Sequence, residues 1–173
     1  MLNSSLTVIE FSTTETAFAT VLVARSKKGV CTILLGDSPA ELYADLQRRL
    51  PKADLVKQDH ALAAVLQNIT DFLDAPLTPF NFPQDIQGSD FQKSVWAVLQ
   101  SIPVGQTLSY SQVAERLHKP KAVRAVANAC AANPLALVIP CHRVLRADGG
   151  VSGYRWGVER KRALLAKEQQ ACQ

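Results

Sequence analysis

The sequence lacks the features that mark membrane-spanning, exported and metal-binding chains. No apolar run approaches the roughly 20 residues of a membrane helix, and residues 1–6 carry no basic segment ahead of an apolar one, so we expect no signal peptide. No two cysteines form a Cys-x-x-Cys pair, and their spacing fits neither a disulfide framework nor a zinc site. We therefore expect a cytoplasmic protein without a metal whose thiols stay reduced: Cys31, Cys130, Cys141 and Cys172.

Charge is divided unevenly along the 173 residues. Residues 1–88 carry a net charge of −3 and residues 89–173 a net charge of +7, within a total of +4. A basic half joined to an acidic half indicates that one face meets a polyanion such as nucleic acid. An imbalance on an ordinary solvated surface gives the same composition, so charge alone leaves both interpretations open.

The first half of the chain reads as a small α+β unit. Apolar, β-branched runs predict strands over residues 6–11, 16–25 and 29–36, and Lys28-Gly29 supplies a turn between the last two. Ser38 is positioned to cap a helix, Pro39 suits its first turn, and Glu41 completes a capping box. A second helix is predicted after Asp59, and its apolar face consists of Leu62, Val65, Leu66, Ile69 and Phe72.

The second half reads as helical, after a proline-rich linker over residues 75–88. Ser89 with Gln92, and Ser109 with Gln112, form two capping boxes that predict helix starts. The second of these helices ends near residue 117, a tight turn covers residues 118–121, and another helix covers residues 121–132. Two short helices joined in this way favour a helix-turn-helix. The last helix is predicted over residues 158–169, and we expect two domains, residues 1–84 and 85–173.

The helix predicted over residues 121–132 has an unusual polar face. Val123, Val126 and Cys130 share one side and suit a core. The opposite side carries small residues around a single arginine, namely Arg124, Ala127, Asn128 and Ala131. Such a face fits close contact with a minor groove, into which the arginine is inserted. It fits equally well a helix packed against another helix of the same chain.

Residues 138–144 form a candidate reactive centre. An apolar run over residues 135–139 should be buried, and Pro140 stiffens the backbone before Cys141. His142 and Arg143 follow, and cationic neighbours lower the pKa of a thiol and so favour the nucleophilic thiolate. Glu168, in the last predicted helix, is a candidate to orient His142. Burial of Cys141 as a small apolar side chain is the simpler alternative.

The run Ile139-Pro140-Cys141-His142-Arg143-Val144 resembles the reactive motif of the O6-alkylguanine-DNA alkyltransferases, or methylated-DNA–protein-cysteine methyltransferases. The resemblance covers nearly the whole chain. Within the family, the run from Gly153 to Lys161 most resembles the C-terminal half of the adaptive-response proteins. The other matching segments are Phe91–Trp96, Ser109-Tyr110, Lys121–Val126, Asn133-Pro134, Ser152–Tyr154, Leu164–Glu168 and Gly29–Asp37.

The resemblance implies a role for each matching residue. Cys141 is the implied nucleophile and alkyl acceptor, and His142, oriented by Glu168, takes its proton through a water. Asn133 fixes the turn that builds the pocket, and Tyr110 assists departure of the guanine and pushes the 3′ phosphate. In the implied guanine pocket, the backbone near Val144 and around Tyr154 and Arg155 holds the base. The implied DNA contacts come from Arg124, which fills the space of the flipped base, and from Tyr110, Lys119, Lys121, Ala127, Asn128 and Arg146.

The resemblance also implies the fold and the partners. It implies an α+β chain in which a small ribonuclease-H-like unit is followed by a helical domain with a helix-turn-helix. The partner is double-stranded DNA containing O6-alkylguanine, whose alkylated base must leave the stack to react. The reaction is single-turnover DNA repair, and we expect a monomer with no cofactor and no membrane association. Activity on O4-alkylthymine is left open.

Two departures from the family pattern bear on function. Arg155-Trp156 is bulkier than the matching stretch of many members, so we expect slower transfer of large groups such as benzyl than of methyl. Residues 1–88 lack the cysteine set of the metal-binding half of the adaptive-response proteins, so no transcription-activator role is predicted. The rival interpretations are a DNA-binding regulator without chemistry and a cysteine hydrolase. The presence of Cys141 disfavours the first, and the adjacency of Cys141 and His142 disfavours the second.

Overall fold

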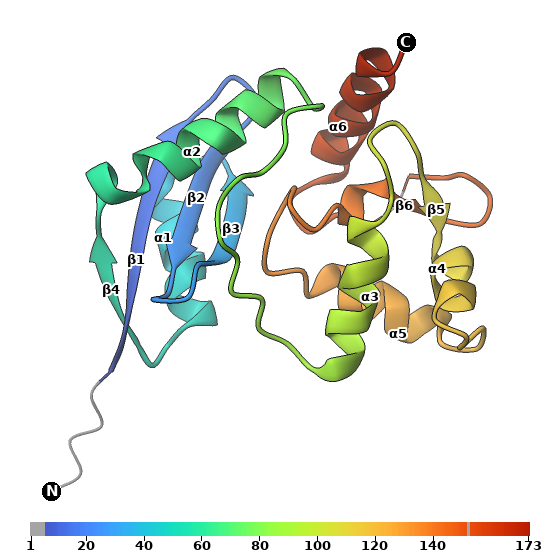
Figure 1. Cartoon of the computed structure of the whole chain (residues 1–173), viewed down its shortest axis with the longest axis horizontal. Coiled ribbons are helices and arrows are strands. Elements are labelled where there is room, and N and C mark those ends of the chain that lie inside the picture. The colour runs from blue at the N-terminus through green and yellow to red at the C-terminus, as the bar shows by residue number, and fades with distance from the viewer. Residues whose placement is uncertain (1–5, 152) are drawn as a thin grey trace, which may run out of the picture.

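The computed structural model describes residues 6–151 and 153–173. Residues 1–5 belong to the segment in which we expect no signal peptide, and they lie outside these ranges. Ser152, which belongs to one of the segments that match the family, also lies outside them. A sheet with a helix on each face forms one part of the molecule, and a helical part lies beside it (Figure 1). The architecture is α+β. None of the helices within the described ranges has the length and apolar character that a membrane crossing needs.

The sheet has four strands in the order β3-β2-β1-β4. Strands β1 (Thr7–Glu15), β2 (Thr20–Arg25) and β3 (Val30–Gly36) form an antiparallel meander, whereas β4 (Ala53–Lys57) lies parallel to β1. Helix α1 (Pro39–Arg49) covers one face and α2 (Asp59–Asp74) covers the other (Figure 1). Because both faces are covered, β2 is buried on both sides, which accounts for its uninterrupted apolar sequence.

The sheet differs from the prediction in three places. Strand β1 runs on to Glu15, beyond the predicted end at residue 11. The predicted strand over residues 16–25 begins only at Thr20, because Thr16 forms a turn. Its hydroxyl accepts from the N–H groups of Phe18 and Ala19. Strand β4 was not predicted, because its side chains are exposed or half-buried and lack a clear apolar alternation. The Ser38 cap is confirmed, since the Ser38 hydroxyl accepts from the Glu41 N–H. Within the described part of the chain, the structure gives no return hydrogen bond from the Glu41 side chain, so this capping box is only half formed.

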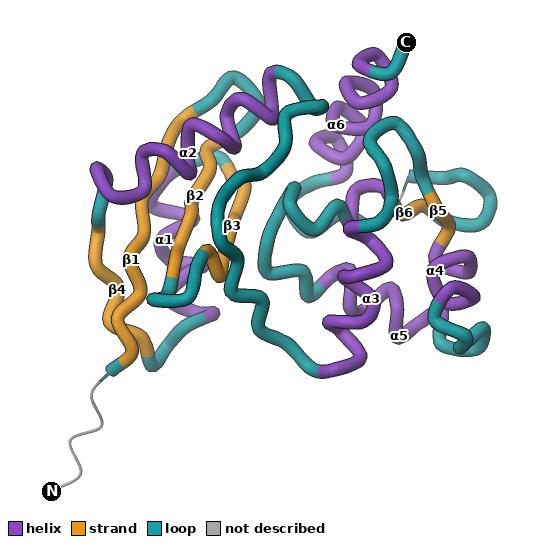
Figure 2. Tube along the Cα trace, viewed as in Figure 1, coloured by secondary structure: helices purple, strands orange, loops and turns teal. Residues whose placement is uncertain are grey.

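Helices α3 (Asp90–Gln100), α4 (Tyr110–Arg116), α5 (Val123–Ala131) and α6 (Val158–Ala171) form the second part (Figure 2). Two of the three predicted capping boxes are present, at Ser89 with Gln92 and at Ser109 with Gln112. Helix α5 packs on α3 and α4. Trp96 fixes this arrangement from α3, because its buried indole N–H donates to the Ala129 carbonyl at 2.9 Å.

Strand β3 joins the two parts through main-chain hydrogen bonds. The linker pairs with its start, where the Val30 N–H donates to the Pro83 carbonyl and the Asp85 N–H donates to the Val30 carbonyl. Further along, the Ile33 N–H donates to the Pro134 carbonyl, and the Ile33 carbonyl accepts from the Ala136 N–H. The sheet edge therefore supports the segment that leads to Cys141.

Candidate active site

Asn133 shapes the buried segment before Cys141. Residues 135–139 are all buried, as predicted. The Asn133 side-chain carbonyl accepts from the Leu135 N–H at 2.9 Å, and its amide donates to the Ile139 carbonyl at 2.7 Å. The same amide lies 3.2 Å from the Cys141 sulfur. One fully buried side chain thus closes the turn and contacts the thiol.

Cys141 begins a single 3-10 turn, η1 (Cys141–Arg143), whose three side chains are buried. The His142 Nε2 lies 2.6 Å from Glu168 Oε1. Arg143 forms a two-pronged pair with the same carboxylate, with both N–O distances at 2.9 Å, and also donates to the Ile102 carbonyl. The structure therefore brings Cys141, His142 and Glu168 together across 26 residues of sequence.

The expected lowering of the thiol pKa by His142 and Arg143 is wrong. Both side chains are directed to Glu168, whose negative charge offsets that of Arg143, and His142 is neutral. Burial raises the pKa of Cys141 to about 11, against the opposing effects of the Asn133 hydrogen bond and of Lys161. At neutral pH the resting side chain is the protonated thiol, so nucleophilic attack requires a base.

His142 has the ionisation state that a base needs. Burial keeps the pKa of Glu168 from falling further, yet hydrogen bonds from His142 and Arg143 lower it to about 2. A carboxylate only accepts hydrogen bonds, so the His142 proton lies on Nε2. Burial also lowers the pKa of His142 below 6.5; the nearby charges of Arg143 and Lys161 add to this lowering, and Glu168 opposes it. Its Nδ1 is buried, has no hydrogen-bond partner among the described residues, and carries a free lone pair.

Lys161 is a buried residue of the site that the sequence reasoning missed. Its ammonium donates to the Val144 carbonyl at 2.7 Å and lies 6.0 Å from the centre of the Tyr110 ring. Burial lowers the pKa of this lysine below 10.5. Helix α6 buries Lys161, Leu164 and Glu168 on one face, at spacings of three, four and seven residues. That spacing is visible in the sequence and could have identified Lys161.

A cavity of about 480 Å³ opens beside the thiol. Pairing of β5 (Leu108–Ser109) with β6 (Val144–Leu145), which directly follows η1, places the start of α4 and therefore Tyr110 beside this turn. The Val144 side chain is fully buried and does not line the cavity, and the resemblance assigns the contact with guanine to the backbone near this residue. The lining residues are Tyr110, Ala127, Cys130, Ala131, Cys141, Gly153, Tyr154 and Arg155.

The small-residue face of α5 is not packed against this chain. Arg124 and Asn128 are exposed, and Ala127 is half-buried at the cavity. Packing against another helix of the described chain is therefore excluded for this face. Arg124, Ala127 and Ala131 form one stripe along the helix, so the arginine stands in line with the cavity. The other basic residues expected to meet DNA are also exposed, namely Lys119, Lys121 and Arg146.

Residues 90–170 match the family model described as "6-O-methylguanine DNA methyltransferase, DNA binding domain". The inducible methylated-DNA–protein-cysteine methyltransferase of Bacillus subtilis is 39% identical, over 86% of this chain and 84% of that protein. This chain belongs to the methylated-DNA–protein-cysteine methyltransferase family. That assignment agrees with the resemblance seen in the sequence alone.

Two further relatives place the chain within the family. The bifunctional transcriptional activator/DNA repair enzyme Ada of Escherichia coli is 52% identical over 85% of this chain. The chain spans only 42% of the length of that protein. A crystal structure of the Mycobacterium tuberculosis methyltransferase OGT in complex with DNA superimposes with a TM-score of 0.79. It has 29% identity, and the match covers 94% of each chain.

The buried His142–Glu168 pair should make the protein lose stability in acid. The folded state holds the pKa of His142 below 6.5 and that of Glu168 near 2 instead of 4.5, so the unfolded chain binds these protons more readily. The contribution is therefore fully present above pH 6.5. It is lost as the pH falls, first through His142 and then, between pH 4.5 and pH 2, through Glu168. Urea denaturation at a series of pH values measures the free energy of unfolding.

The variant His142→Gln serves as the control for this prediction. It should remove the part of the decline that occurs between about pH 7 and about pH 5. The assignment of a neutral, buried His142 is contradicted when wild type and variant lose the same stability over that interval.

Proposed function

We propose that this protein repairs DNA by moving the alkyl group of O6-alkylguanine onto its own Cys141, once per molecule. The observation that carries the proposal is the joint position of three groups. The Cys141 thiol lies in a cavity wall, its neighbour His142 presents a free Nδ1, and Glu168 holds the opposite nitrogen of the ring. This is the arrangement of an activated cysteine nucleophile.

The proposed reaction is a displacement at the alkyl carbon. The sulfur–carbon bond forms as the carbon–O6 bond breaks, and the bonding electrons move to the guanine. The thiol proton passes to His142 Nδ1 through a water, and guanine gains a proton in exchange. We assign assistance to the departing guanine to Tyr110, which lines the cavity. The product is a thioether, and the transfer needs no cofactor.

Asn133, Val144, Tyr154 and Arg155 complete the proposed pocket. Asn133 holds the turn and contacts the sulfur. Tyr154 and Arg155 line the cavity, and we assign to them and to the Val144 backbone the binding of guanine. The Val144 carbonyl also accepts from Lys161, which keeps the backbone of β6 against α6. Whether O4-alkylthymine is a further substrate stays open.

We propose that α4 and α5 form a helix-turn-helix that binds duplex DNA along its minor groove. Its turn contains His118 with a φ of 58°, a left-handed conformation that permits the tight connection. Arg124 would fill the space of the flipped base, and the DNA backbone would meet Lys119, Lys121, Asn128 and Arg146. The small residues Ala127 and Ala131 allow close approach.

We also propose a finer division of the fold into two domains. The strand order β3-β2-β1-β4, with only β4 parallel to its neighbour, supports a ribonuclease-H-like unit over residues 1–84. The helical alkyl-transfer domain would then cover residues 85–173. We infer a monomer with reduced thiols that acts in the cytoplasm.

The first prediction from the proposed function concerns the alkyl acceptor. Incubation with excess duplex DNA that carries one O6-methylguanine should add a single methyl group to the intact protein, and peptide mapping should place it on Cys141. The variant Cys141→Ala should gain no mass but keep its affinity for DNA. Added mass on Cys130, the other cavity thiol, would refute the assignment, and repeated turnover on an ester would favour a cysteine hydrolase.

The second prediction concerns Arg124. A base that leaves the stack costs a few kcal/mol, and an inserted side chain offsets part of that cost. The variant Arg124→Ala should therefore slow methyl transfer from duplex DNA about tenfold or more, whereas its reaction with free O6-methylguanine stays unchanged. Arg162→Ala, which removes an exposed arginine of α6, is the matched control. An equal loss of transfer rate with both substrates would rule out the role of Arg124 in filling the space of the flipped base.

The third prediction concerns the size of the alkyl group. Tyr154, which lines the cavity, is backed by Trp156, and that buried indole cannot yield without disturbing the core. Benzyl transfer should be about tenfold slower than methyl transfer or worse. Arg155→Ala should raise the benzyl rate relative to the methyl rate, as single-turnover kinetics with both adducts would measure. Equal benzyl and methyl rates in the wild type would contradict the account.

A further inference from the structure

Tyr154 is held rigidly at the edge of the cavity. Its ring is buried and contacts Trp156 edge-on, with ring centroids 5.3 Å apart and an angle of 75° between the planes. Trp156 is itself buried, and the Arg155 guanidinium lies 5.8 Å from its ring centre. Burial of the ring and its contact with Trp156 therefore set the direction in which the Tyr154 hydroxyl points.

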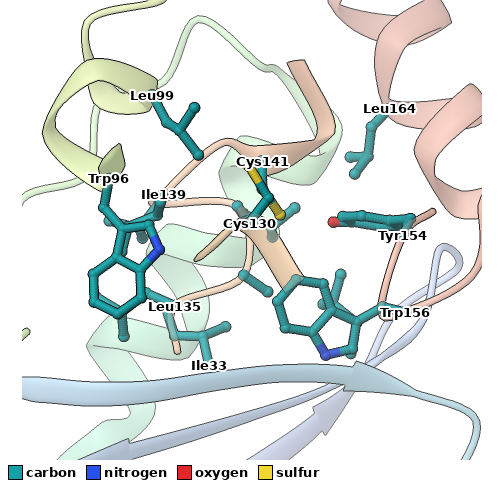
Figure 3. Close-up of a cluster of buried hydrophobic side chains, with 14 of the residues drawn as sticks. Ile33, Trp96, Leu99, Cys130, Leu135, Ile139, Cys141, Tyr154, Trp156 and Leu164 are labelled. Atoms are coloured by element: carbon teal, nitrogen blue, oxygen red, sulfur yellow. The ribbon is translucent and has the colours of Figure 1, made fainter. Parts of the chain in front are cut away.

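The hydroxyl of Tyr154 points toward the two cavity thiols (Figure 3). Its oxygen is buried, yet it has no hydrogen-bond partner among the described residues. A buried hydroxyl without a partner is a cost to the folded state. An unpartnered hydroxyl that points at a reacting atom indicates a role in the reaction. The sulfur of Cys141 is the reacting atom of the proposed transfer.

The thiolate of Cys141 is poorly supported by its other neighbours. Asn133 is the one side chain for which the structure gives a hydrogen bond to the sulfur within the described ranges, at 3.2 Å. Lys161 faces the thiol from α6 and favours its ionisation, but its ammonium is engaged with the Val144 carbonyl. Tyr110 from α4 and Cys130 from α5 also face the cavity. A buried thiolate with a single neutral donor is costly to form.

We propose that the Tyr154 hydroxyl is a second hydrogen-bond donor to the Cys141 thiolate, formed as His142 removes the thiol proton. The inference rests on the proposed alkyl transfer. Tyr154 is thereby a catalytic residue in the attack itself, in addition to a wall of the pocket. Burial raises the pKa of Tyr154 well above 10, so the phenol keeps its own proton and acts as a donor throughout.

The variant Tyr154→Phe tests this inference, because it removes the hydroxyl and keeps the ring. Cys141 is alkylated with iodoacetamide between about pH 7 and about pH 9, and its rate is followed by peptide mass. Below the thiol pKa this rate reports the thiolate fraction. Loss of one donor should raise the thiol pKa by about one unit and so lower the rate about tenfold at every pH in that range. Methyl transfer from DNA should fall by a similar factor.

Tyr43→Phe is the matched control, since this tyrosine stacks on Phe11 under the N-terminal sheet, away from the cavity. It should leave both rates unchanged. Tyr154→Phe should also unfold at the same urea concentration as the wild type or a higher one, because it removes an unpartnered hydroxyl. An iodoacetamide rate in Tyr154→Phe equal to that of the wild type overturns the inference.

The two levels of the account fail separately in this experiment. A wild-type protein that takes no methyl group from DNA refutes the proposed function. Even then, an iodoacetamide rate about tenfold lower in Tyr154→Phe than in the wild type would still establish the contact between Tyr154 and the thiolate.

Discussion

The arrangement of the site depends on one buried carboxylate, that of Glu168. It comes from α6, which follows the reactive turn η1 in sequence, and it accepts from both His142 and Arg143. Removing a carboxylate from water is costly unless it is paired and fully hydrogen-bonded. Arg143 supplies a two-pronged pair and His142 supplies a third donor. The buried charge is therefore stable only when η1 and α6 are packed so that all three hydrogen bonds form. Correct placement of Cys141 is therefore tied to the stability of this part of the fold.

The same carboxylate determines the chemistry of its two neighbours. Arg143 balances its charge, so His142 need not be protonated to pair with it and stays neutral as a base. Cys141 in turn receives no net positive charge from the residues that follow it, and burial keeps it a thiol. A thiol with a raised pKa reacts slowly with oxidants and other electrophiles. It becomes nucleophilic when a base and hydrogen-bond donors act together, which suits a protein whose nucleophile is used once.

Much of the fold could be predicted from local sequence signals. The capping boxes at Ser89 and Ser109 form as expected, because a helix start is decided by a few adjacent residues. Strand β4 was missed, because an edge strand depends on its partner more than on its own side chains. The proximity of Cys141, His142 and Glu168 was predicted from the family resemblance, because the spacing of these residues in the sequence does not indicate it. The wrong expectation for the thiol pKa arose because sequence adjacency says nothing of where His142 and Arg143 point.

The most direct test of this account is the protonation state of the His142 ring in the resting protein. The ¹⁵N chemical shifts of its two nitrogens at neutral pH distinguish the possible forms. The account predicts a neutral ring with its proton on Nε2, facing Glu168, and an unprotonated Nδ1 available to Cys141. A doubly protonated ring at neutral pH, or a proton on Nδ1, would contradict the assignment of His142 as the base.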